Sequence, residues 1–165
     1  MLPIKVLGHR KNSIMENVAN IFVELIESNG LSDLKNWNEI KVNHTSRELF
    51  NKTVKEIDKN QNGLYCYFDC EKCLYVGKGK PILKRLQDHF SKCISEKPLE
   101  EIEKYKAWYA FFRQYRKELT VYYVEFDIKD KTVGNFLREA VESYISNKYQ
   151  PEFISFQKSF KDFDK

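Results

Sequence analysis

The sequence predicts an α+β fold in which a small central β-sheet, made of a hairpin and a third strand, is flanked by helices. Two tyrosine-containing runs, at 64–68 and 73–76, and the run LTVYYVEFDI at 119–128 are rich in residues that favour strands. Segments with apolar residues at helical spacing lie before, between and after these runs. With 165 residues, 42% of them hydrophobic, the chain can bury a core within one domain. We expect three parts: a helical N-terminal extension at 1–61 packed on the core, a core at 62–154 that contains the sheet, and a C-terminal tail at 155–165.

Two helices are expected in the N-terminal extension. Ser13 and Glu16 have the spacing of a capping box and open a helix that would stop at Gly30. Thr45 and Glu48 repeat that spacing and open a second helix, which ends before the polar run KNQNG. A short helix or turn between the two would carry Leu34, Trp37 and Ile40.

The core begins with the hairpin, whose two strands are joined by the run DCEK. Because side chains alternate along a strand, Tyr65 and Tyr67 share one face of it. Pro81 suits the first turn of a helix that runs to about residue 93, and Pro98 suits the start of a second helix. The strand at 119–128 follows, and a last helix runs from about 132 to 149.

Positive charge is concentrated in two segments, although the net charge of the chain is only +4. Residues 78–92 hold five basic side chains against one acid, and residues 104–117 hold five more. Such clusters are either solvated helix faces or contacts for a polyanion such as DNA. The candidate phosphate-binding residues are Lys78, Lys80, Lys84, Arg113 and Arg116.

The sequence gives no sign of a membrane or a secreted protein. No apolar run approaches the length of a membrane helix, and the start MLPIKVLGHRK does not resemble a secretory signal, so we expect a cytoplasmic protein. Disulfides are then not expected. The pair Cys70 and Cys73 has the spacing of half a zinc site, and Cys66, Cys93 and His89 would have to complete it. A zinc-stabilised interaction domain is therefore one alternative, and free thiols are the other.

Groups suited to phosphate chemistry gather around the hairpin and the helix that follows it. Arg85 and His89 are four residues apart and lie on the same face of that helix, where they would border a cleft. Together with the two hairpin tyrosines, Tyr65 and Tyr75, they offer hydrogen-bond donors for a phosphate and groups able to move a proton. In the last helix, Glu139 points away from the apolar face and Glu142 lies at its border. Glu142 is therefore the predicted carboxylate ligand of a divalent metal.

These residues resemble a known family. The triplets Gly63-Leu64-Tyr65 and Tyr75-Val76-Gly77 resemble the paired motifs of the GIY-YIG endonucleases, and their separation fits that family. The run KRLQDHF is similar to the family's first helix, with Arg85 at the catalytic arginine position and His89 where many members carry histidine. The run ESYISNKYQP is similar to the family's glutamate helix, and counting back from Pro151 again selects Glu142. The resemblance covers about residues 62–154.

The resemblance implies metal-dependent cleavage of DNA. The tyrosine matching Tyr65 activates the attacking water or lies beside the group that does, and the residue matching Tyr75 contacts the phosphate or the water. Arg85 would stabilise the transition state, and Glu142 would hold a single Mg²⁺ or Mn²⁺. His89 would hydrogen-bond the Tyr65 phenol and help to accept its proton. A phenol is a poor base at neutral pH, so we expect Arg85, a lysine and the metal to lower the pKa of Tyr65.

Two departures from the family pattern leave alternatives open. The family often places asparagine three residues after the proline, where this chain has Ile154, and several relatives lack an extension of about 60 residues. A stand-alone restriction or phage-type endonuclease is the main prediction, and a twofold homodimer would suit an enzyme that cuts both strands. The alternatives are a repair- or homing-type structure-dependent nuclease and a non-catalytic nucleic-acid-binding module on the same fold.

Overall fold

The computed structural model describes residues 20–127, 129 and 131–153, and the chain divides into two compact units, 1–36 and 37–165. In the first unit, residues 20–28 are helical and the 3-10 helix η1 spans Leu34–Asn36. The helix stops at Gly30 as predicted, because the φ of Gly30 is +64°, a left-handed conformation that glycine adopts without strain. Its predicted start at Ser13 lies outside the described residues.

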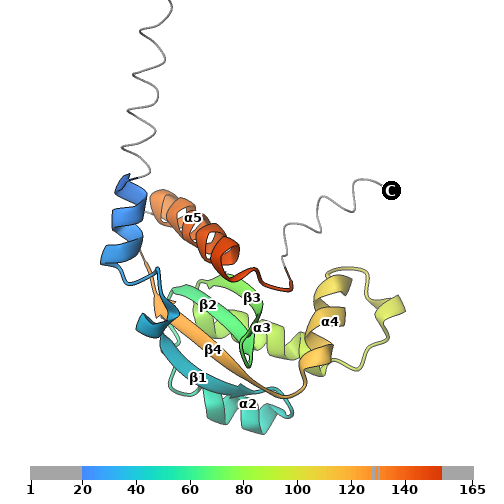
Figure 1. Cartoon of the computed structure of the whole chain (residues 1–165). Coiled ribbons are helices and arrows are strands. Elements are labelled where there is room, and N and C mark those ends of the chain that lie inside the picture. The colour runs from blue at the N-terminus through green and yellow to red at the C-terminus, as the bar shows by residue number, and fades with distance from the viewer. Residues whose placement is uncertain (1–19, 128, 130, 154–165) are drawn as a thin grey trace, which may run out of the picture. The chain divides into compact units, whose positions relative to one another are not determined.

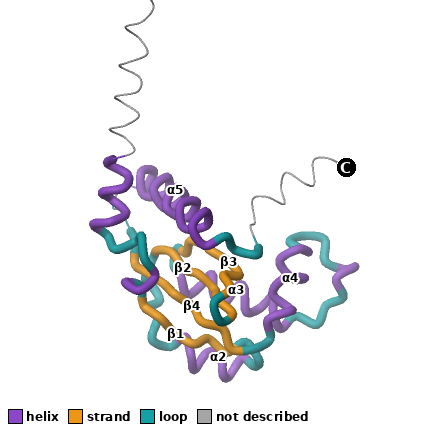
Figure 2. Tube along the Cα trace, viewed as in Figure 1, coloured by secondary structure: helices purple, strands orange, loops and turns teal. Residues whose placement is uncertain are grey.

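The second unit is built on a four-stranded antiparallel sheet, and the predicted α+β class is confirmed (Figures 1 and 2). Its strands are β1 (Asn38–Asn43), β2 (Gly63–Asp69), β3 (Lys72–Gly79) and β4 (Glu118–Glu125), in the order β1-β4-β2-β3. The predicted hairpin is β2 and β3, in which Tyr65 pairs with Gly77 and Tyr67 with Tyr75. The two strands are longer than predicted and meet in a shorter turn, where Cys70 takes a φ of 53°.

Strand β1 corrects the prediction for the segment before the second helix. We expected a short helix or turn containing Ile40, but residues 38–43 pair antiparallel with β4. Ile40 and Val42 are two residues apart, which is the strand period, and Val42 is fully buried. The predicted domain boundary at residue 61 falls within the second unit, between α2 and β2.

Two predicted helix starts are wrong in detail. Helix α2 (Arg47–Val54) is capped by Ser46, whose Oγ accepts from the backbone N–H of Leu49 at 3.2 Å. The neighbouring Thr45, which we expected as the cap, donates instead to Oδ1 of Asn43 at 2.6 Å. Pro98 is followed only by the 3-10 helix η2 (Leu99–Glu101), and helix α4 (Lys106–Phe112) begins later, after Tyr105, whose φ of 60° lies outside the right-handed helical region. The 3-10 helix η3 (Arg113–Tyr115) follows α4.

The two faces of the sheet are covered by different helices. Helix α5 (Lys131–Tyr149) packs on one face, where the rings of Phe68 and Tyr149 lie 5.9 Å apart. Helices α2 and α3 (Ile82–Ile94) pack on the other face, where Phe50 stacks on Phe90 with ring centroids 4.2 Å apart. Figure 1 shows α5 and α3 on opposite sides of the sheet. The prediction of helices at 81–93 and 132–149 is confirmed to within one residue at each end.

Strand β3 lies at the edge of the sheet, where segments from both faces of the sheet can reach it. After α5 the chain returns along the first half of β3, where the N–H groups of Glu152 and Phe153 donate to the carbonyls of Cys73 and Leu74 at 3.1 and 3.0 Å. The second half of β3 carries Lys78 and continues into α3. Around this second half, helices from the two faces of the sheet can approach one another.

Candidate active site

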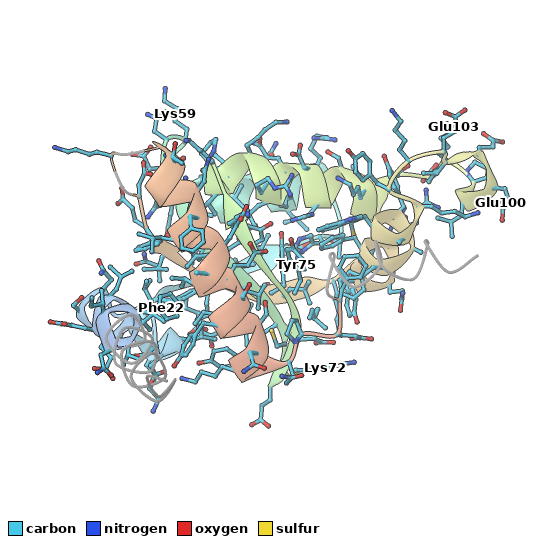
Figure 3. The ribbon with its side chains drawn as sticks, turned by 90° about the horizontal axis from the view of Figure 1, so that it is seen from above. Phe22, Lys59, Lys72, Tyr75, Glu100 and Glu103 are labelled. Atoms are coloured by element: carbon cyan, nitrogen blue, oxygen red, sulfur yellow. The ribbon has the colours of Figure 1, made fainter. Side chains whose placement is uncertain are left out.

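A cleft of about 380 Å³ lies beside β3 and is lined by four elements. Strand β3 and helices α3, α4 and α5 contribute the lining residues, which are Tyr75, Lys78, Arg85, Trp108, Glu139, Glu142 and Ser143. Figure 3 labels Tyr75 near the centre of the unit, whereas Glu100 and Glu103 lie at its outer end. Three of the five predicted catalytic residues therefore line one cleft, although they are far apart in the sequence.

The other two, Tyr65 and His89, form a hydrogen bond behind this cleft. The Oη of Tyr65 lies 2.6 Å from Nε2 of His89, and both side chains are buried. The imidazole stacks on Phe112 and Trp108, with ring centroids 4.4 and 5.2 Å away, so its orientation is fixed by packing. The hydrogen bond between them was expected from the resemblance, and the structure brings the pair together as predicted.

The direction of the Tyr65 pKa shift corrects the prediction. We expected neighbouring cations to favour the phenolate, but burial raises the pKa of Tyr65 well above 10, and Tyr75, Tyr67 and Glu142 add to this. Arg85 alone among these neighbours lowers it, and burial outweighs that effect. Burial also lowers the pKa of His89 well below 6.5, with the Arg85 charge acting in the same direction. At neutral pH the pair is a phenol bonded to a neutral imidazole.

Because Gly77 has no side chain, the rings of Tyr65 and Tyr75 can pack directly against its backbone. A Cβ at Gly77 would lie 2.6 Å from Cε1 of Tyr75, 2.7 Å from Oη of Tyr65 and 2.8 Å from its Cζ. All three distances are shorter than atoms of this kind approach in proteins. The last residue of the Tyr75-Val76-Gly77 triplet therefore has to be small, because the Tyr65 phenol lies against its backbone.

Two carboxylates of α5 meet a lysine of β3 in the cleft. Nζ of Lys78 lies 2.7 Å from Glu139 and 3.6 Å from Glu142. The Glu142 side chain is 22% exposed and that of Glu139 is 63% exposed, in agreement with the predicted border position of Glu142. Burial raises the pKa of Glu142, while Lys78 opposes that shift. The hydrogen bond from Lys78 lowers the pKa of Glu139.

Arg85 lines the cleft, and its contact with the nearest carboxylate is long. Its side chain is 45% exposed, and its guanidinium lies 4.0 Å from Asp88, whose carboxylate is already paired with Lys84 at 2.9 Å. Arg85 lines the same cleft as Glu142, and its charge lowers the pKa of both Tyr65 and Glu142, against the effect of burial. The predicted convergence of guanidinium, carboxylate and phenols is therefore present in the fold.

The predicted phosphate contacts divide into two groups. Lys78 lines the cleft, whereas Lys80 is exposed and is not among the lining residues, and Lys84 pairs with Asp88. Arg113 donates to the backbone carbonyl of Lys97, and Arg116 donates to that of Cys93 at 2.9 Å. The last two side chains tie η3 and the residue after it to the end of α3 and the segment that follows, and the structure does not bring them to the cleft.

The cysteines do not form the zinc site that we considered. Cys66 faces the α5 side of the sheet, whereas Cys93 lies in the core on the α3 side, and Cys70 is exposed in the turn. Within the described residues, no group of three or more His, Cys, Asp or Glu side chains could hold a metal ion. The zinc alternative is therefore wrong for this part of the chain.

A hydrated magnesium ion fits the cleft better than a fully enclosed metal. Mg²⁺ usually keeps several waters and binds through one or two carboxylates together with substrate phosphates. The pair Glu142 and Glu139 meets this need, because a single ammonium group, that of Lys78, already reaches both carboxylates. The donor set could therefore hold Mg²⁺ or Mn²⁺, with Glu142 as the half-buried ligand and Glu139 as the exposed one.

Sequence reasoning missed two residues that shape the site. Trp108, an aromatic residue of α4, lines the cleft while it stacks on His89. Ser143 follows Glu142 and also lines the cleft. Trp108 belongs to no motif, and Ser143 lies in the run ESYISNKYQP without a role of its own, so only the structure places the two side chains at the cleft.

Within the described residues, no helix has both the length and the apolar character that crossing a membrane requires. Comparison of the chain with protein-family models, with curated proteins and with solved structures finds no match.

Proposed function

We propose that this chain is a metal-dependent DNA endonuclease that hydrolyses phosphodiester bonds by a GIY-YIG-type mechanism. One observation carries the proposal: a guanidinium, a half-buried carboxylate and a tyrosine from three separate elements line the same cleft, and a phenol–imidazole hydrogen bond lies directly behind it. Phosphodiester hydrolysis needs stabilisation of charge on the phosphoryl oxygens and a group that orients water. The cleft offers side chains for both needs.

Arg85 is suited to the charge that develops on the phosphoryl oxygens. A guanidinium presents several N–H donors in a plane and binds phosphate oxygens in a bidentate manner. Its weak contact with Asp88, at 4.0 Å, leaves it able to turn to a phosphate. Lys78 is the second cation of the cleft, and it can exchange its carboxylate partners for a phosphate oxygen once these carboxylates bind a metal.

Tyr65 is better suited to orienting water than to removing its proton. Because its pKa lies well above 10, Tyr65 keeps its proton at neutral pH, and His89, whose pKa lies well below 6.5, is a poor acceptor for it. Of the two roles that the resemblance left open, we infer that Tyr65 lies beside the group that activates water. Tyr75, which lines the cleft, would contact the phosphate or the water.

Glu142, with Glu139 beside it, would hold the divalent ion. When bound, the ion supplies a positive charge that stabilises the departing oxygen. The residues of the chain then fix the substrate: Arg85 from α3 and Lys78 from β3 on the phosphate, and Tyr75 on the wall of the cleft. DNA is the proposed partner, and a homodimer remains a prediction.

A cleavage assay with matched variants tests the proposal. Supercoiled plasmid is incubated with Mg²⁺ or Mn²⁺ and with wild type, Glu142→Ala or Glu71→Ala. Glu71 is exposed in the hairpin turn and serves as the control carboxylate. We expect the wild type and Glu71→Ala to nick and linearise the plasmid, and Glu142→Ala to bind DNA without cutting it. Binding without cleavage by the wild type with either ion would favour the non-catalytic module, and equal cleavage by Glu142→Ala would exclude that carboxylate.

A further inference from the structure

A second cleft adjoins the first and shares two of its residues. It measures about 360 Å³ and is lined by Arg85, Asp88, His89, Lys92, Tyr105 and Trp108. Arg85 and Trp108 also line the first cleft, so the guanidinium stands between two neighbouring concavities. The volume falls within the range of about 300–1,000 Å³ that is typical of sites for small molecules. None of the proposed catalytic steps uses Lys92 or Tyr105.

The charge of this second cleft favours an anion. Arg85 and Lys92 face a single acid, Asp88, which is already paired with Lys84 at 2.9 Å. Lys92 forms no salt bridge in the part of the chain that the structure describes, and its ammonium donates to the backbone carbonyl of Asp88 at 3.3 Å. Burial lowers the pKa of Lys92; Asp88 opposes that shift, and the nearby charges of Arg85 and Lys84 add to it. A phosphate would relieve the repulsion among these cations.

Tyr105 supplies an exposed aromatic wall. The Tyr105 residue lines the second cleft and is nevertheless 68% exposed to solvent. The backbone of Tyr105 is held in the left-handed region at φ 60°, and its carbonyl accepts from the N–H groups of Trp108 at 2.8 Å and Tyr109 at 3.2 Å. The first turn of α4 therefore fixes the backbone from which this ring projects. A ring held in this way at the rim of a basic cleft is typical of a stacking surface for a base.

His89 gives an independent sign of a polar ligand. Its Nε2 bonds Tyr65, but its Nδ1 is buried and has no hydrogen-bond partner within the described residues. The His89 side chain also lines the second cleft. A buried polar atom without a partner is costly, and a ligand or its bound water can satisfy it.

We propose that the second cleft binds the nucleotide next to the scissile phosphate, with its base unpaired and stacked on Tyr105 and its phosphate held by Lys92 and Arg85. This inference rests on the proposed endonuclease function and names its substrate class: DNA with an unpaired nucleotide beside the cut, as in a bulge, gap or flap. A base inside a duplex is stacked on both faces, so only an extruded or unpaired base can offer a face to Tyr105.

Binding measured without metal tests the inference separately from cleavage. Two oligonucleotide duplexes carry the fluorescent base 2-aminopurine, one with that base unpaired and one with it fully paired. We expect the wild type to bind the unpaired form more tightly and to quench its fluorescence. Tyr105→Ala should lose about 5- to 140-fold in affinity for the unpaired form, which corresponds to the loss of one stacked base. Tyr105→Phe should retain the affinity, and Tyr144→Ala, which removes an exposed tyrosine outside both clefts, should match the wild type.

Lys92→Ala tests the phosphate contact. It should weaken binding of both duplexes and reduce the slope of log affinity against log salt by roughly one, whereas Lys55→Ala, on the exposed end of α2, should not. Equal binding of the paired and unpaired duplexes by the wild type, or wild-type affinity in Tyr105→Ala, would overturn the inference while Glu142-dependent cleavage of plasmid remained. Failure of the wild type to bind either duplex would overturn the proposed function as well.

Discussion

Replacement of Gly77 by alanine should destabilise the protein, although the same change in most strands stabilises it. Glycine in a strand normally costs about 0.5–1 kcal/mol relative to alanine, because its unfolded chain is more flexible. At Gly77 the new Cβ would meet the rings of Tyr75 and Tyr65 at 2.6 to 2.8 Å. Both rings are buried, and Tyr65 is also tied to His89, so neither can move at low cost.

The expected cost combines three effects. Forcing a methyl group into a packed core costs about 1–3 kcal/mol. Moving the phenol away from His89 gives up a hydrogen bond worth about 0.5–1.5 kcal/mol. The gain from restricting the unfolded chain returns about 0.4–1 kcal/mol. The net prediction is a loss of about 0.5–4 kcal/mol in the free energy of unfolding.

Urea unfolding followed by circular dichroism measures this loss. With a slope of about 1–3 kcal/mol per molar urea, a loss of about 2 kcal/mol lowers the midpoint by roughly 1 M. The double variant Tyr65→Leu/Gly77→Ala is the matched control. It removes two of the three close contacts, so Gly77→Ala should cost less in the Tyr65→Leu background.

The sign of the effect decides the argument. If Gly77→Ala is as stable as the wild type or more stable, the phenol does not occupy the space above Gly77. An equal cost in both backgrounds would also refute the reasoning, since the Tyr65 ring would then not be the obstacle.

Three further predictions follow from the same geometry. Burial lowers the pKa of His44 to about 4. Between about pH 6.5 and 4, His44 is therefore protonated in the unfolded chain and neutral in the folded chain. Stability should therefore fall by up to about 3 kcal/mol as the pH drops from about 6.5 to 4, and urea titrations of His44→Asn should show a flatter pH dependence. Arg85→Ala should lower the single-turnover cleavage rate by about 10²–10³-fold or more while DNA affinity is largely kept, because the charge of Arg85 matters most in the transition state. An equal loss of DNA affinity would instead show that Arg85 acts in ground-state binding. Lys78→Ala should raise the affinity for Mn²⁺ measured by calorimetry, because the substitution removes the ammonium that competes with the ion for Glu139 and Glu142. Weaker binding of Mn²⁺ would show that these carboxylates do not hold the ion.

The resemblance identified five catalytic candidates, and the structure brings all five together around one cleft. Helical spacing placed Arg85 and His89 on one face of α3 and set Glu142 nearer the buried border of α5 than Glu139. Strand alternation placed Tyr65 and Tyr67 on one face of β2. These are local relations, and local periodicity is sufficient to predict them.

Other features of the site depend on packing between distant segments. The sign of the Tyr65 pKa shift depends on how deeply helices bury the phenol, and motif residues alone suggested the opposite direction. The salt bridge from Lys78 to Glu139 joins side chains 61 positions apart, and Trp108 reaches the cleft from a helix that no motif marked. Strand β1 formed where apolar residues three apart had suggested a helix or turn, because β4 offered an edge to pair with.

The sequence by itself determined the class of fold, the hairpin and its flanking helices, and the face of each element on which the candidate residues lie. Those properties follow from spacing along one segment. Only the tertiary structure decided that the residues converge around the second half of β3, that burial raises the pKa of the Tyr65 phenol, and that a second basic cleft lies beside the first. Distances between segments and the burial of a charge are properties of packing, and no single stretch of the chain contains them.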